Sequence, residues 1–182
     1  MKHDDIHIIK EVLGGKSEQF EHILNRYGGQ VFNLIAHIVP CKEDAEELTQ
    51  DVFIKAFRQL SSFKEESCFS TWIYRIATNT ALSAARKRKY NTLHLDDAAY
   101  SNIHDEIIDE ALDNDSEEQL QRLSEAIDRL NAEERALITL YYMNEIPIAE
   151  VATIMRLTES NVKIRLYRTR KKLYLLLNDR KT

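Results

Sequence analysis

Apolar residues recur at three- and four-residue spacing along most of the chain, which is the period of a helix buried on one face. The clearest run covers residues 20–38 and is expected to end near Pro40. The same period predicts a helix over 43–60 and another over 71–89, with Ser70 as the N-cap of the latter. Alternating runs of β-branched residues, which are typical of strands, are missing. The pattern predicts an all-α protein.

The second half of the chain repeats this pattern in shorter segments. Residues 120–130 carry one apolar face, and Asn131 is followed three residues later by Glu134, the spacing of a capping box. A further apolar segment leads to a short helix over 147–155, a turn, and a final helix over 159–177. Three or four helices are sufficient for a second small core.

The two helical parts are separated by an acidic segment without a sustained helical stripe. Residues 91–118 hold ten acidic and no basic side chains, whereas 1–90 have a net charge of +1 and 119–182 of +4. The total of −5 is therefore an average over unlike segments. We predict two helical domains, at 10–90 and 119–178, joined by an acidic linker.

Composition makes several classes of protein improbable. Cys41 and Cys68 stand in no CxxC motif, and the six histidines form no HExxH pair, so we expect neither a disulfide scaffold nor a metal site. No Walker A loop or GxSxG motif is present, so we expect no cofactor and no catalysis by this chain alone. The charged N-terminus and the absence of a long apolar run predict a soluble cytoplasmic protein with no membrane insertion.

The segment around 147–172 has the spacing of a helix-turn-helix. Ala152 is small enough for the helix crossing, and apolar residues surround it. Residues 156–182 have a net charge of +7, which suits binding to the phosphates of DNA. A solvated amphipathic helix is the alternative interpretation of such a basic run. The side chains expected to point outward are Ser160, Asn161, Lys163, Arg165, Arg168, Arg170, Lys171 and Lys172.

Two further features suggest binding surfaces. The basic run 86–89 ends a helix that carries aromatic residues, and aromatic rings beside cations suit single-stranded bases. The rings can equally belong to the core. An acidic face on the helix over 43–60 is either a solvated surface or a docking site for a basic helical partner. The residues of the acidic face are Asp44, Glu47, Gln50 and Asp51.

Three motifs in order carry a resemblance to a known family. DAEELTQDVFIKAF, FKEESCFSTWIYRIATNTALSAARKRK and IAEVATIMRLTESNVKIRLYRTRKKL, with an acidic spacer before the last, resemble the extracytoplasmic-function sigma factors of the sigma-70 family. The resemblance covers about residues 10–177. It implies a bacterial factor that binds core RNA polymerase and promoter DNA, and an anti-sigma factor as a further partner.

The resemblance also implies roles for particular residues. Asp44, Glu47, Gln50 and Asp51 would dock on the coiled-coil clamp helices of the largest polymerase subunit. The residues expected to bind the −10 element are Phe63, Phe69, Trp72, Arg75, Asn79, Arg86, Lys87, Arg88 and Lys89. The residues expected to read the −35 element are Ser160, Asn161, Lys163, Arg165, Arg168 and Lys171. The linker is expected to thread toward the active-site cleft and the RNA exit path of the polymerase.

Three positions depart from the family pattern. Ser83 replaces a common Asp, Ser160 and Asn161 replace a frequent Gly-Thr pair, and Arg156 replaces the glycine of the turn. Arg156 would carry the cost of a positive φ if the turn keeps its shape. Two other functions remain open: a helix-turn-helix regulator that acts without polymerase, and a sigma-like protein that has lost promoter recognition.

Overall fold

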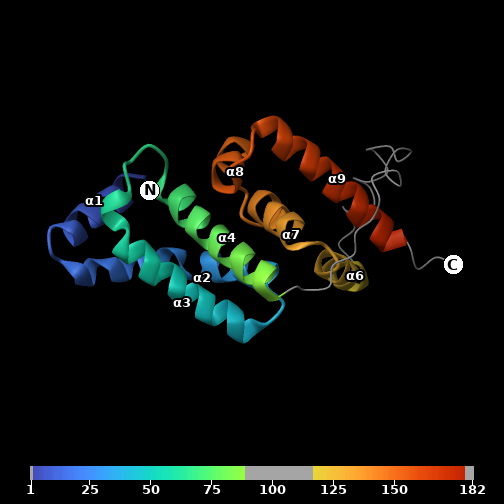
Figure 1. The fold of residues 1–182 in the computed structure, drawn as a ribbon, viewed down its shortest axis with the longest axis horizontal. Coiled ribbons are helices and arrows are strands. Elements are labelled where there is room, and N and C mark those ends of the chain that lie inside the picture. Colours follow the sequence, from blue (N-terminus) through green and yellow to red (C-terminus); the bar gives the residue numbers. More distant parts are fainter. Residues whose placement is uncertain (1, 89–116, 179–182) are drawn as a thin grey trace.

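A computed structural model describes residues 2–88 and 117–178 of the chain, and in these two ranges the regular structure is helical throughout (Figure 1). The predicted all-α class is confirmed. The 28-residue segment between the ranges, with most of the predicted acidic linker, lies outside the described residues. The elements are α1 (Lys2–Leu13), η1 (Ser17–Gln19), α2 (Phe20–Ile38), α3 (Lys42–Arg58), η2 (Leu60–Ser62), α4 (Phe69–Arg88), α6 (Glu117–Asp128), α7 (Ala132–Ile138), η4 (Thr139–Met143), α8 (Ile148–Met155) and α9 (Glu159–Asn178).

Helices α2, α3 and α4 pack against one another and form the first core. The apolar stripe of α2 supplies Ile23, Leu34 and Ile35, which are fully buried. Burial of one such side chain contributes about 1.5–3 kcal/mol. The three helices match the sequence prediction, except that Ser70 is not an N-cap, because α4 begins at Phe69. The backbone N–H of Trp72 donates to the carbonyl oxygen of Cys68 at 3.2 Å, so the first turn closes one or two residues earlier than expected.

Helix α1 was not predicted from the sequence. It buries Ile9 and Val12 against the first core. Asp5 is also buried and accepts hydrogen bonds from the guanidinium of Arg26 and, at 2.7 Å, from the hydroxyl of Tyr27. These contacts compensate for burying a carboxylate and fix α1 on α2.

Helices α6, α7, α8 and α9 form the second group. The predicted capping box at the start of α7 is confirmed: Asn131 Oδ1 accepts from the N–H of Glu134, and Glu134 Oε2 accepts from the N–H of Asn131, both at 2.9 Å. The π-helical turn η4 continues α7, and Pro147 precedes α8 as its N-cap. The sequence prediction therefore holds for each of these helices within a few residues.

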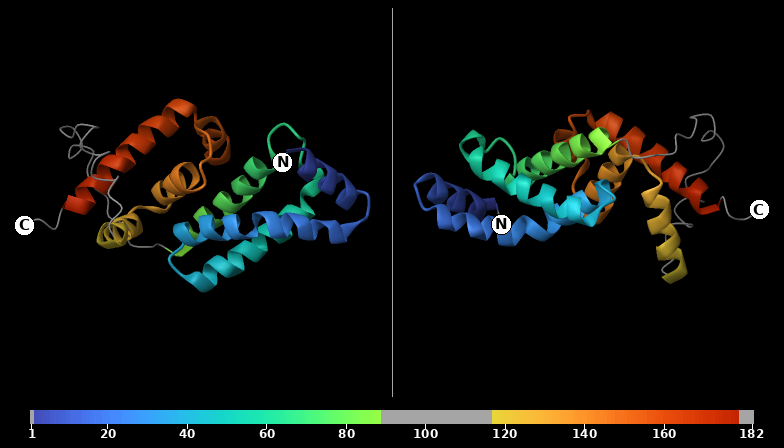
Figure 2. Two further views of the ribbon diagram at one scale, coloured as in Figure 1. Left: turned by 180° about the vertical axis from the view of Figure 1, so that it is seen from behind. Right: turned by 60° about the horizontal axis from the view of Figure 1, so that its bottom comes forward.

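The two groups pack directly against each other. Helix α8 packs against α4, and α7 packs on α2. Helices α1 and α6 lie at opposite ends of the molecule in both views of Figure 2. Buried residues of both groups form one continuous apolar cluster. The pattern along the chain predicts helices but contains no signal for this contact between the two groups.

Candidate nucleic-acid interface

An aromatic cluster supports the loop that precedes α4. The rings of Phe63 and Phe69 meet edge to face with centroids 5.4 Å apart, and Trp72 lies 5.4 Å from Phe69 and 5.7 Å from Phe63. Tyr27 of α2 adds a further edge contact with Phe69. Phe69 and Trp72 are buried, whereas Phe63 is half-buried. In this arrangement the rings fix the loop 63–68 in place, and their direct contact with DNA stays a prediction.

A polar stripe follows α4 away from this loop. Arg75, Asn79 and Ser83 recur at a spacing of four residues and therefore share one side of the helix. Arg75 is half-buried, and Asn79, Ser83, Arg86 and Lys87 are exposed. Lys89 and the side chain of Arg88 lie outside the described residues. The exposed part of the predicted −10 surface is thus a stripe of hydrogen-bonding groups that leads into a basic helix end.

The loop borders a pocket of about 430 Å³. One wall consists of residues 65–69 and Thr71, and Ile6 of α1 contributes an apolar edge. The opposite wall is formed by Ala149, Glu150 and Thr153 of α8. Two segments that are 80 residues apart in the sequence therefore line one pocket.

Helix α3 presents a surface with both acidic and apolar residues. Glu47, Gln50 and Asp51 are exposed as predicted, and Asp44 is half-buried. Beside them, Ile54 and Phe57 are 47% and 43% exposed, although both are large and apolar. With Leu24, Gly28 and Phe53 they line a groove of about 650 Å³ that Gln50 and Arg58 border. Phe57 lies at the rim of this groove.

The turn between α8 and α9 keeps the geometry of a helix-turn-helix. Ala152, Val151, Val162 and Leu166 are buried as predicted. Arg156 has φ +56° and ψ +45°, so it adopts the left-handed conformation expected of a glycine there. The hydroxyl of Thr158 accepts from the N–H of Asn161 at 3.2 Å and so caps α9.

Only part of the α9 face that we expected to point outward faces solvent, and Arg170 is half-buried. The exposed members are Ser160, Asn161, Lys163, Arg165 and Arg168. The prediction that Lys171 and Lys172 point outward is wrong, since they are 4% and 2% exposed. The ammonium of Lys171 lies 4.4 Å from the ring centroid of Tyr167, where a cation–π contact offsets part of its lost hydration.

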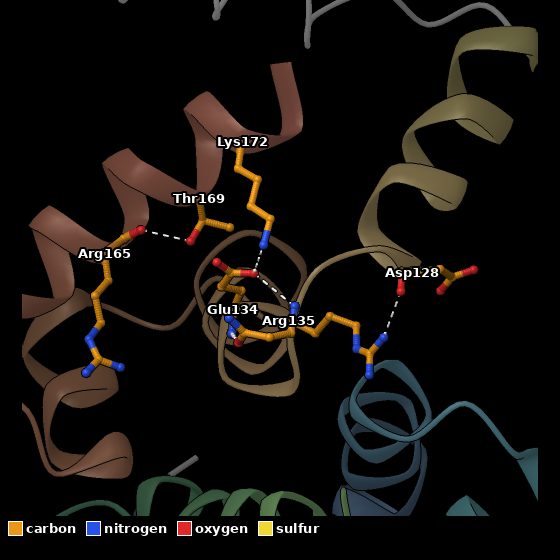
Figure 3. A network of polar contacts seen from close by, with 7 residues as sticks. Asp128, Glu134, Arg135, Arg165, Thr169 and Lys172 are labelled. Carbon is orange, nitrogen blue, oxygen red and sulfur yellow. Dashed lines mark hydrogen bonds and ion pairs between the residues drawn. The ribbon is translucent and has the colours of Figure 1, made fainter. Parts of the chain in front are cut away.

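Helix α7 holds α9 in place through a polar network (Figure 3). Glu134 Oε2 accepts from the ammonium of Lys172 at 2.8 Å, and the same carboxylate closes the capping box. The adjacent Glu133 accepts from the guanidinium of Arg165 at 3.0 Å. These contacts fix the rotation of α9 relative to α7, so the side chains of Ser160 and Lys163 stay on the exposed face.

The described parts of the chain provide no cluster of His, Cys, Asp or Glu that could hold a metal ion. A search of the same residues finds no helix that is long and apolar enough to cross a membrane. What the structure offers is a set of exposed basic, amide and hydroxyl groups on helices with fixed orientation. Such groups suit recognition of a polyanion and of base edges.

Comparison with known proteins decides the family. The model of the family described as Sigma-70 region 2 matches residues 23–90, and that of Sigma-70, region 4 matches residues 120–173. The sigma-E factor of Escherichia coli K12, an extracytoplasmic-function (ECF) RNA polymerase sigma factor, is 31% identical over 170 residues, covering 90% of this chain and 88% of the relative. The chain belongs to the ECF sigma factors of the sigma-70 family.

Other relatives agree with this assignment. The ECF sigma factor SigW of Bacillus subtilis is 29% identical over 178 residues, covering 94% of this sigma factor and 95% of SigW. CnrH, solved in complex with the cytosolic domain of CnrY, has the same fold, with a TM-score of 0.68 at 20% identity over 96% of this chain and 97% of CnrH. RpoE from Bartonella quintana, solved with the anti-sigma factor NepR, gives a TM-score of 0.65 at 22% identity. This match covers 90% of this chain and 99% of RpoE.

In this sigma factor, region 2 corresponds to α2, α3 and α4, and region 4 to α6 through α9. Sequence reasoning missed the exposed Ile54, the cap Thr158 and the pair formed by Glu133 and Arg165. A signal for Ile54 was available, because it is apolar but falls outside the inward stripe of α3. No local signal marks Glu133, because its partner lies 32 residues away.

Proposed function

We propose that this sigma factor binds core RNA polymerase and directs it to promoters, with region 2 capturing bases of the −10 element and region 4 reading the −35 duplex. The observation that carries the proposal is the presence, on one chain, of both sigma regions, each with an exposed polar face of its own. A regulator that acts without polymerase would not need region 2. The proposed function requires a cytoplasmic location, where the polymerase works.

The −35 element is proposed to meet the N-terminal half of α9. Asn161 and Lys163 are exposed there, and Ser160 starts the face. Amide groups can pair with the edge of adenine, and cations with guanine or with phosphates, when a helix enters the major groove. Arg165 and Arg168, one and two turns further on, are suited to the DNA backbone.

The −10 element is proposed to meet the loop 63–68 and the stripe of Arg75 and Asn79. Opening a duplex costs stacking and pairing energy, and a protein without ATP must recover this energy by binding the exposed bases. The loop pocket has room for a base, and the exposed amide of Asn79 can both donate and accept hydrogen bonds.

Core polymerase is proposed to dock on α3. Glu47 and Asp51 offer negative charge for a basic helical partner, and Ile54 and Phe57 offer an apolar centre for the contact. An anti-sigma factor that silences this chain would have to cover the same surface or the DNA-facing helices.

Reconstituted transcription tests the proposal directly. The chain is combined with bacterial core polymerase and a library of promoter-sized duplexes, and the RNA products are sequenced. We expect RNA with defined start sites that depends on the chain. If the chain binds specific duplexes without core polymerase and yields no start-site-specific RNA, it is instead a regulator that acts without polymerase.

Two substitutions test whether region 2 acts in promoter opening and region 4 in duplex binding. Asn79→Ala is expected to impair promoter opening, measured by permanganate reactivity of unpaired thymines, with little effect on the closed complex. Asn161→Ala is expected to weaken upstream duplex binding by about 1–3 kcal/mol, the value of one good base contact. Asn25→Ala, which changes an exposed asparagine on α2, is the control for Asn79. Equal effects of both substitutions on duplex binding would contradict the division.

A further inference from the structure

Helix α1 precedes both sigma regions, because the region 2 match begins at residue 23. It packs against α2, and it also meets η2 and α4, the two elements that flank the loop 63–68. Figure 1 shows α1 beside the green loop that leads into α4. A helix that touches both ends of a binding loop is placed to control the shape of that loop.

Two neighbouring faces of α1 make these contacts. The first face buries Ile9 and Val12 against the first core. On the second face, Ile6 and Lys10 lie one turn apart on the side of the loop. Ile6 borders the loop pocket, and Lys10 Nζ lies 3.7 Å from Glu65 Oε1. The first face holds the helix on the core, so the second face is available to hold the loop.

Glu65, in the middle of the loop, has a strained backbone. Its φ of +57° lies in the left-handed region, which disfavours residues that carry a side chain. The backbone hydrogen bonds described for this loop lie at its two ends: the N–H of Phe63 donates to Leu60 at 3.1 Å, and that of Trp72 donates to Cys68 at 3.2 Å. A strained residue between those bonds persists when its surroundings fix it, and the ion pair with α1 is such a contact.

Asp5 anchors α1 on region 2. It is 5% exposed, and its two carboxylate oxygens accept from the guanidinium of Arg26 and, at 2.7 Å, from the hydroxyl of Tyr27. Burial and the hydrogen bond to Asp5 raise the pKa of Tyr27, so the phenol stays protonated and remains a donor. Hydrogen bonds to an ionised acceptor are stronger than those between neutral groups, so this carboxylate is a firm attachment point for the helix.

The ring of Tyr27 extends this attachment to the loop. It meets Phe69, the first residue of α4, edge to face with ring centroids 5.6 Å apart. Phe69 in turn meets Phe63, at the other end of the loop, with centroids 5.4 Å apart. Asp5 is therefore connected to the loop in two ways, through these packed rings and through the helix that carries Lys10.

We infer that α1 is a positioning element for the −10 loop, in which Lys10 holds Glu65 and Asp5 anchors the helix. A loop that binds unstacked bases only in one shape has an apparent Kd equal to the intrinsic Kd divided by the fraction of loops in that shape. Contacts that raise this fraction therefore tighten binding although neither residue touches DNA. The inference rests on the proposed function for the ligand of the loop, whereas the ordering of the loop by α1 rests on the contacts alone.

A charge-swap cycle in the full chain tests the contact between α1 and the loop. Lys10→Glu and Glu65→Lys each place like charges opposite one another, and the double variant restores an ion pair at the native net charge. Order in the loop is measured by hydrogen–deuterium exchange of the amides of residues 64–68 at short labelling times. Each single variant is expected to raise this exchange about two- to fivefold, the range for a surface ion pair, and the double variant to restore it.

Affinity for DNA is the second measurement. The probe is a random pool of 12-nucleotide single-stranded DNA, and a 20-base-pair duplex serves as the reference for region 4. Lys10→Glu is expected to bind the single strands about two- to fivefold more weakly and the duplex as the native chain does, and the double variant to recover the native affinity. The matched control is Lys42→Glu, which makes the same charge change at an exposed lysine with Glu46 one turn away, and it should leave both affinities unchanged.

Asp5→Asn tests the anchor. The amide keeps an acceptor for Tyr27 but removes the charge that faces Arg26, so α1 is expected to loosen and exchange in the loop to rise about tenfold. Exchange of residues 31–38, in the buried part of α2, is expected to stay at the native value. An equal rise in both segments would make Asp5 a general stability residue and overturn its positioning role. The charge-swap cycle at two exposed side chains then decides the role of Lys10.

Unchanged exchange in the loop of both single variants, or no recovery in the double variant, would overturn the inference. A looser loop with native affinity for single strands would overturn it as well, because α1 would then order a loop that does not take up bases. Transcription by the native chain with core polymerase separates the two proposals. Start-site-specific RNA would leave the proposed function standing while this inference fails, and the absence of such RNA would mean that the proposed function fails.

Discussion

Single residues in this sigma factor illustrate how a local cost is offset by contacts elsewhere. Arg156 keeps the left-handed turn of the helix-turn-helix at φ +56°, a conformation that disfavours side chains by about 1–2 kcal/mol. The N–H of Leu157 donates to the carbonyl oxygen of Ala152 at 2.9 Å and closes the turn, and both residues belong to the core or border it. The shape of the turn therefore survives the loss of glycine.

Glu134 is expected to be the most sensitive polar residue of region 4. It closes the capping box and pairs with the buried Lys172, so Glu134→Ala removes a cap and one partner of a buried cation. A loss of about 3 kcal/mol in the free energy of unfolding is expected, measured by urea denaturation. The neighbouring Glu133→Ala breaks a half-exposed pair and should cost less than about 0.5 kcal/mol. Equal losses would show that burial of Lys172 does not matter.

Helices α3 and α4 each have a buried face that packs in the core and an exposed face that is proposed to bind a partner. The buried face of α3 places Val52 and Ala56 in the first core, and the exposed face holds the acidic residues with Ile54. Helix α4 is divided in the same way, since Ile73 and Ala77 are fully buried on one face and Asn79 and Ser83 are exposed on the opposite one. Each helix is therefore held by one face and is proposed to act through another.

The apolar centre of the α3 surface gives a prediction for polymerase binding. Ile54→Ser removes a side chain that is 47% exposed and is expected to leave the free energy of unfolding nearly unchanged. It should weaken binding to core polymerase about tenfold, or about 1.4 kcal/mol, in a competition assay. Leu13→Ser, at a similarly exposed position on α1, is the matched control. Full affinity of Ile54→Ser for core would exclude this groove from the contact.

At the scale of the whole molecule, charge is distributed unevenly along the chain. The acidic surplus belongs to residues 91–118, and the rest of the chain is net positive. The exposed basic groups include Lys163, Arg165 and Arg168 on α9 and Arg86 and Lys87 near the end of α4. DNA affinity should consequently follow the local charge of region 4 and not the total of −5.

Salt dependence tests this partition. Binding of the full chain to a 20-base-pair duplex, measured by fluorescence anisotropy, is expected to weaken steeply with salt, because neutralised phosphates release counterions. Lys163→Gln should reduce the slope of log K against log salt by about 1 if Lys163 meets a phosphate. Lys42→Gln, an exposed lysine on α3, should leave the slope unchanged. An identical change of this slope in both variants would indicate that the lysines act through long-range attraction and that Lys163 makes no specific phosphate contact.

The sequence by itself determined the helices other than α1 and most of their inward faces, because helical period, Pro40, Pro147 and the capping box at Asn131 are local signals. It also determined the family, through motifs that are contiguous in the chain. Only the tertiary structure decided that Lys171 and Lys172 turn inward, that Ile54 and Phe57 form a groove, and that α8 lies on α4. These depend on contacts between residues tens of positions apart, which no local period encodes.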